Sequence, residues 1–242
     1  MCTVFVPEGI VMAADSRQTI GITAVKPGSA GQQQKIAQTD LLNRMNQPGM
    51  PPQGIPMFTH SDNAQKIMLL DKVKVGISAC GLSILDGKTV SDYIRTFEIR
   101  ELTARDTVTT VATKLQKYAE KFFPKVNFFV CGYDKDEPFC YTVGKELRRN
   151  NYENGHVRYA SAWSGEQLAI TKLLNGNPPM IINHLLMPLK DAIDFADFLV
   201  DLTIKTQRFE MKPATCGGDI DILVLTKDES FWYRHKIFKP AR

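Results

Sequence analysis

Residues 2–14, CTVFVPEGIVMAA, form two short apolar runs around a turn. The runs CTVFV and GIVMAA are rich in β-branched and other apolar residues, which favour strands. Between them stand Pro7, Glu8 and Gly9, a combination typical of turns. The sequence therefore predicts an antiparallel hairpin here, with Asp15 at the end of its second strand.

The character of the sequence changes between about residues 25 and 60. Five of the thirteen prolines fall in this stretch, which lacks sustained periodicity apart from a possible short amphipathic helix at 36–45. A stretch of this length inside a compact domain is usually functional or mobile. We interpret it as a flexible insert, a long loop or lid, in a single domain spanning 1–242.

The remaining chain alternates between groups of strands and pairs of helices. We predict strands at 65–81, helices at 83–102 and 106–123, with Asp106 as a helix cap, strands at 126–134, 138–143 and 156–162, helices at 165–174 and 189–209, and strands at 219–226 and 230–238. Runs of each type indicate layered α+β packing more than strict βαβ alternation.

Composition excludes several functional classes. The net charge is only +4 and the sequence has no block of like charges, so it predicts no surface that binds nucleic acid or a membrane. The chain shows no apolar run long enough to span a membrane and no secretion signal, so we expect a cytoplasmic protein. The five cysteines lack zinc-site spacing, and we expect reduced thiols, with Cys131 and Cys140 in the core. The four scattered histidines and a misspaced Gly-Lys-Thr segment predict neither a metal nor a cofactor.

Cys2 follows Met1 and is a candidate nucleophile. A small second residue allows methionine aminopeptidase to remove Met1, which would leave Cys2 with a free α-amine. The thiol, with a reference pKa of about 8.5, would then share one residue with an amine of pKa about 7.7–8.0. That amine could accept the thiol proton as the sulfur attacks a carbonyl carbon, so no separate histidine is required.

Five segments carry a resemblance to a known family. They are GIVMAADSRQT at 9–19, QKIMLLDKVKVGISACG at 65–81, VCGYDKDEPFCYTV at 130–143, WSGE at 163–166 and CGGDIDILVLTKD at 216–228. In this order they resemble the proteasome β-subunit family of N-terminal-nucleophile (Ntn) hydrolases, over nearly the whole chain. The resemblance implies a four-layer αββα sandwich and assembly into rings.

The resemblance also implies roles for single residues. Asp15 would orient Lys66, and the positive charge of Lys66 would lower the pKa of the nucleophile. The backbone N–H of Cys80, with Gly81 beside it, would bind the oxyanion. Ser164 would support the terminal amine together with the glycine that follows it, although a helix N-cap role explains Ser164 equally well.

The chain departs from the family pattern at several positions. Cys2 stands where the family has threonine, and it lies 15 − 2 = 13 positions before Asp15, which makes the hairpin shorter than the family's. An odd shortfall places alternate side chains on the opposite face unless a bulge corrects it. The family's late Asp and Ser fall on Pro213 and Cys216. The insert also lengthens the separation of Asp15 and Lys66 to 66 − 15 = 51 positions.

Three functional hypotheses remain open on the sequence. The first is a proteasome-like Ntn hydrolase in which Cys2, after loss of Met1, cleaves an amide or peptide bond. The second is a catalytically inactive ring or scaffold subunit, favoured by the short hairpin, Pro213 and Cys216. The third is an amidase for small amides. We expect a peptide or small amide as substrate, a homo-oligomer or ring as the assembly, and no nucleic-acid, membrane, metal or cofactor partner.

Overall fold

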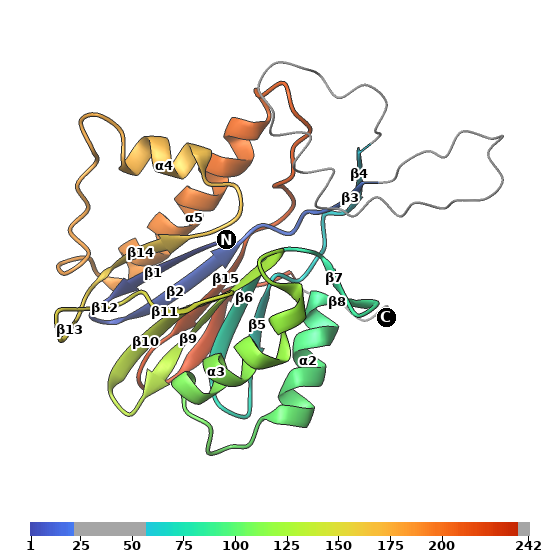
Figure 1. The fold of residues 1–242 in the computed structure, drawn as a ribbon. Coiled ribbons are helices and arrows are strands. Elements are labelled where there is room, and N and C mark those ends of the chain that lie inside the picture. The colour runs from blue at the N-terminus through green and yellow to red at the C-terminus, as the bar shows by residue number, and fades with distance from the viewer. Residues whose placement is uncertain (22–56, 237–242) are drawn as a thin grey trace, which may run out of the picture.

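The computed structural model describes residues 1–21 and 57–236, shown as coloured ribbon in Figure 1. The strands are β1 (Cys2–Val6), β2 (Gly9–Ala14), β3 (Gln18–Gly21), β4 (Met57–Ser61), β5 (Ile67–Leu70), β6 (Val75–Gly81), β7 (Ile84–Leu85), β8 (Lys88–Thr89), β9 (Val126–Asp134), β10 (Glu137–Val143), β11 (Leu147–Arg149), β12 (Tyr152–Glu153), β13 (His156–Val157), β14 (Ala160–Trp163), β15 (Asp221–Leu225) and β16 (Ser230–Arg234). The helices are α2 (Val90–Glu101), α3 (Val108–Tyr118), a 3-10 turn at Glu120–Phe122, α4 (Leu168–Leu174) and α5 (Leu189–Gln207). The predicted helix at 36–45 and most of the insert lie outside the described residues.

The predicted hairpin at the start of the chain is confirmed. Strands β1 and β2 pair antiparallel in an unbroken register from Cys2 opposite Ala13 to Val6 opposite Gly9, which leaves a two-residue turn. The hairpin lies inside a five-stranded sheet of order β14-β1-β2-β15-β16. A second five-stranded sheet has the order β11-β10-β9-β6-β5. Both strands of the hairpin are buried along their whole length because the sheet is covered on both faces.

The first predicted helix begins later than its sequence indicated. Residues 84–89 form the small hairpin β7-β8, and α2 begins only at Val90, after Thr89. Gly87, at φ +75°, supplies the left-handed turn between the two strands.

The cap predicted at Asp106 for the second helix is also wrong. The Thr107 side chain accepts the N–H of Thr110 at the start of α3, whereas Asp106 accepts the N–H of Thr103.

Two hydrophobic clusters position the beginning of the chain. One lies between the two large sheets and contains Phe5, Met12 and Leu223, together with Cys131 and Cys140, so the prediction that these cysteines are core residues is confirmed. The other lies between the first sheet and α5, which runs beside β1 and β2 in Figure 1. The largest cluster gathers side chains of α2, α3 and the second sheet.

The predicted fold class, an α+β four-layer αββα sandwich of the Ntn-hydrolase type, is wrong. The structure has a mixed α/β fold with mostly antiparallel sheets, about 27% helix and 34% strand. In the described part of the chain, the strands divide among two five-stranded and three two-stranded sheets. An order of elements does not by itself determine a fold class, because one order is compatible with several packings.

Candidate functional site

The charged pair of the candidate site consists of Asp15 and Lys66. Asp15 follows β2 in the first large sheet, and Lys66 precedes β5 in the second. Lys66 Nζ lies 2.7 Å from Asp15 Oδ1. The other carboxylate oxygen accepts the backbone N–H groups of Arg17 at 3.2 Å and Gly217 at 3.0 Å. The structure therefore brings together two side chains that the sequence separates by 51 positions.

The Asp15 carboxyl group is only 3% exposed, yet its surroundings favour the ionised form. Burial by itself would raise the pKa of Asp15. The Lys66 ammonium, the terminal amine and the hydrogen bonds from Lys66 and Gly217 outweigh burial and hold this pKa below its usual value. The site is thus a buried negative charge that is compensated by a cation and by two backbone donors.

Ser164 lies next to the first residue of the chain. The terminal amine of Met1 donates to the backbone carbonyl of Ser164 at 3.2 Å, and the N–H of Ser164 donates to the carbonyl of Met1 at 3.1 Å. The Ser164 hydroxyl lies 3.1 Å from Cys80 Sγ. Sequence analysis predicted that Ser164 supports the amine of Cys2 after loss of Met1; the amine that contacts Ser164 here is that of Met1, so the predicted role stays a prediction. The N-cap of α4 is Gln167, so Ser164 does not cap that helix.

Cys2 is not part of this constellation. Its side chain is fully buried, and Sγ donates to the backbone carbonyl of Ala196 in α5 at 3.4 Å. Burial raises the pKa of the Cys2 thiol to about 12, against a smaller lowering by the terminal amine. Lys66 is not among the main causes of this shift, and its predicted effect on the nucleophile stays a prediction.

The orientation of Cys2 follows from strand alternation. Side chains of a strand point alternately to opposite faces. Cys2 and Val4 pack in the cluster beside α5, whereas Met1 and Phe5 pack between the two large sheets. The pairing of β1 with β2 has no bulge that would turn Cys2 around, which is the correction that the short hairpin required.

Gly81 has a packing role that requires glycine. Its φ is +105°, and a Cβ atom at this position would lie 2.2 Å from the carbonyl oxygen of Lys125. Any other residue would force that backbone apart. The glycine beside the predicted oxyanion amide of Cys80 is therefore explained without catalysis, and the oxyanion role remains a prediction.

A polar network that sequence analysis missed adjoins the site. Gln207, at the end of α5, accepts the N–H groups of Thr215 and Cys216, each at 2.9 Å. Thr215 Oγ1 donates to Glu166 at 2.9 Å. Gln207 belongs to the polar residues of a predicted helix, and its sequence offered no signal that it would bind the segment before β15.

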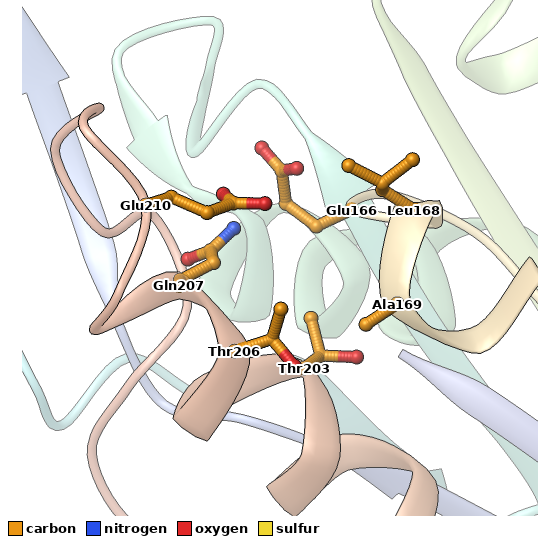
Figure 2. A pocket seen from close by; sticks show the side chains of 7 residues that line it. All are labelled: Glu166, Leu168, Ala169, Thr203, Thr206, Gln207 and Glu210. Carbon is orange, nitrogen blue, oxygen red and sulfur yellow. The ribbon is translucent and has the colours of Figure 1, made fainter. Parts of the chain in front are cut away.

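Figure 2 shows the surface pocket beside this network, between α4 and α5. It is lined by Glu166, Leu168, Ala169, Thr203, Thr206, Gln207 and Glu210. Lys212 bridges the two glutamates at 3.2 and 3.3 Å. The pocket therefore presents charges that are already compensated. Cys216, on the other side of the network, has a pKa raised to about 11 by burial and by Asp15.

The described residues 1–21 and 57–236 contain no group of three or more His, Cys, Asp or Glu side chains that could hold a metal ion. Among the helices of the same residues, none has the length and apolar character needed to cross a membrane. All five cysteines are free thiols.

No model of a protein family matches the chain, and no curated protein does so either. The resemblance to proteasome β-subunits therefore depends on the five sequence segments alone.

Proposed function

We propose that this chain is a proteasome-like subunit that has no amide-hydrolase activity and functions by associating with copies of itself in a ring or scaffold. The observation that carries the proposal is the place of the Cys2 sulfur, which is buried against α5. The resemblance to the proteasome family supports assembly with other copies of the chain. The buried position of the Cys2 sulfur supports the absence of hydrolase activity.

The orientation of Cys2 is enforced on both sides of β1. Cys2 pairs with Ala13 in β2 and with Trp163 in β14. Turning the sulfur toward Lys66 requires either a bulge, which the pairing lacks, or a slip of one residue, which would move every side chain of β1 to the opposite face. Buried residues such as Val4 and Phe5 would then exchange environments. This reasoning holds whatever precedes Cys2.

The charged pair has a structural role in such a subunit. Asp15 connects the end of β2 to Lys66 before β5 and to Gly217 before β15. One carboxylate thus joins two sheets and the segment that enters the first sheet. Stabilisation of the fold therefore explains the Asp15–Lys66 pair without any reaction at this position.

The surface that follows α5 supports association. Phe209 is 87% exposed and Met211 is fully exposed, although both are large apolar side chains. Lys212 and Glu210 place charges of both signs beside them. Exposed apolar side chains flanked by charges of both signs are typical of a surface that contacts another protein chain. We therefore assign a second copy of this chain as its occupant.

Replacing Met211 with glutamate is expected to convert the oligomer into a monomer, because a carboxylate would be buried in the contact. Light scattering coupled to size-exclusion chromatography measures the molar mass of wild type and variant. The control is Ile99→Glu, at a 60% exposed position on α2, which should leave the mass unchanged. A monomeric wild type, or an equal effect of both variants, contradicts the assignment.

A hydrolase is the second candidate, because Asp15, Lys66, Ser164 and the terminal amine do lie together. We expect no hydrolysis of fluorogenic peptides or of small acyl amides, either by the wild type or by Cys2→Ala. Intact mass of the same preparation reports whether Met1 is present. Turnover by the wild type that disappears in Cys2→Ala would reject the inactive subunit, and the preferred substrate would then distinguish a peptidase from a small-amide amidase.

A further inference from the structure

Ser161 and His184 form a close pair outside the candidate site. Ser161 lies on β14, the edge strand of the first large sheet, and His184 lies between α4 and α5. The Ser161 hydroxyl is 2.6 Å from His184 Nε2. Ser161 is opposite Val4, whose side chain packs toward α5, so the hydroxyl points to that face of the sheet.

The His184 ring has polar partners on two sides. Its Nε2 faces the serine, and a hydrogen bond to the backbone of Ile182 engages the ring as well. In a neutral imidazole one ring nitrogen donates and the other accepts, so a ring that donates to a carbonyl can accept from a serine hydroxyl. Burial lowers the pKa of His184, with partial opposition from Ile182, which favours the neutral imidazole.

The surroundings of the pair are aromatic and partly open. The ring of Phe195 meets His184 edge-on at 6.1 Å between centroids. Phe195 stacks in turn on Phe198 at 6.5 Å, and Phe198 is 44% exposed. Both Ser161 and His184 are partly exposed. Phe195 and the exposed Phe198 therefore offer an aromatic surface beside His184 on which an aromatic ring of a ligand could pack.

We propose that Ser161 is a nucleophile activated by His184 and that it accepts acyl groups from esters with an aromatic acyl part. The Ser161 oxygen forms a bond to the acyl carbon while His184 Nε2 takes the hydroxyl proton. The ester C–O bond then breaks, and the proton passes to the leaving alcohol. Water hydrolyses the acyl-serine in the reverse proton sequence. This site is independent of the proposed association and of the Asp15–Lys66 pair.

Phenylmethanesulfonyl fluoride tests the activated serine with the intact chain. The expected adduct is a sulfonyl group on Ser161, formed as the S–F bond breaks and fluoride leaves. Peptide mapping by mass spectrometry identifies the labelled residue. In the wild type, Ser161 should react at least about tenfold faster than Ser91, an accessible serine without a histidine partner, because a positioned base contributes about 10²–10⁴-fold.

Two variants separate activation from exposure. His184→Gln should reduce the labelling rate of Ser161 at least about tenfold, whereas His156→Gln, at an exposed histidine, should not change it. Equal labelling of Ser161 and Ser91 in the wild type overturns the proposal without any variant, and so does an unchanged rate in a folded His184→Gln protein.

Ester turnover gives the second readout. Hydrolysis of p-nitrophenyl benzoate should disappear in Ser161→Ala and persist in Cys2→Ala, because Cys2 pairs with Trp163, two positions along β14 from Ser161, and its sulfur bonds to Ala196 and not to the Ser161–His184 pair. Loss in Cys2→Ala with retention in Ser161→Ala would transfer the activity to the first residue and reject the serine site.

Discussion

Replacing Lys66 with alanine is expected to lower the free energy of unfolding by about 3–5 kcal/mol at neutral pH. Removing one partner of a buried ion pair leaves the other charge uncompensated, and that loss is typically of this size. The carboxylate of Asp15, 3% exposed in the wild type, would keep the backbone donors of Arg17 and Gly217 and the terminal amine but lose the Lys66 ammonium in direct contact with it. Chemical denaturation followed by circular dichroism measures the difference.

The effect of Lys66→Ala should depend on pH with a defined sign. In the wild type the folded-state pKa of Asp15 is lower than its unfolded value. The contribution of Asp15 to the free energy of unfolding is therefore complete above about pH 4, and it is lost as pH falls through the folded-state pKa. In the variant, the lowering by Lys66 is lost while burial still raises this pKa, so the pKa of Asp15 lies higher than in the wild type and protonation relieves the buried charge. The difference in unfolding free energy should consequently shrink as pH falls below about 4.

The control for this prediction is an exposed ion pair. Lys121 lies 2.6 Å from Asp86, and the two side chains are 61% and 48% exposed. Lys121→Ala should change the unfolding free energy by at most about 1 kcal/mol, since water screens such pairs. A similar small change in Lys66→Ala, with no dependence on pH, would show that Asp15 and Lys66 do not stabilise the fold.

Phe5→Ala is expected to destabilise the protein by about 3–5 kcal/mol, because deleting a buried aromatic ring loses its transfer free energy and leaves a cavity. Phe5 is 1% exposed and lies in the cluster between the two large sheets, opposite Ile10. Both sheets hold the cavity open, since neither can move toward the other without disturbing its own strand pairing. Urea denaturation at neutral pH measures this loss.

A surface deletion tests whether the loss is specific to the core. Ile99 is 60% exposed on α2, and Ile99→Ala should change the unfolding free energy by less than about 0.5 kcal/mol. A Phe5→Ala variant as stable as Ile99→Ala would contradict the packing of β1 between the sheets and, with it, the face on which Cys2 lies.

Local sequence patterns determined most of the elements. The apolar runs around Pro7 and Glu8 predicted the hairpin, and the spacing of apolar residues predicted α5 almost to its bounds at Leu189–Gln207. The motifs containing Asp15 and Lys66 also predicted a contact across 51 positions. Each of these depends on periodicity or on a matched motif, both of which are properties of the sequence itself.

Only the tertiary structure decided which face of β1 receives Cys2, and it places the sulfur beside Ala196 in α5. Strand alternation puts neighbours on opposite faces, but the covering of each face depends on β14 and α5, which arrive from distant parts of the chain. For the same reason, the contact between Ser161 and His184 could not be predicted from the sequence. A side chain's neighbours across a sheet are set by packing between elements, which no local pattern records.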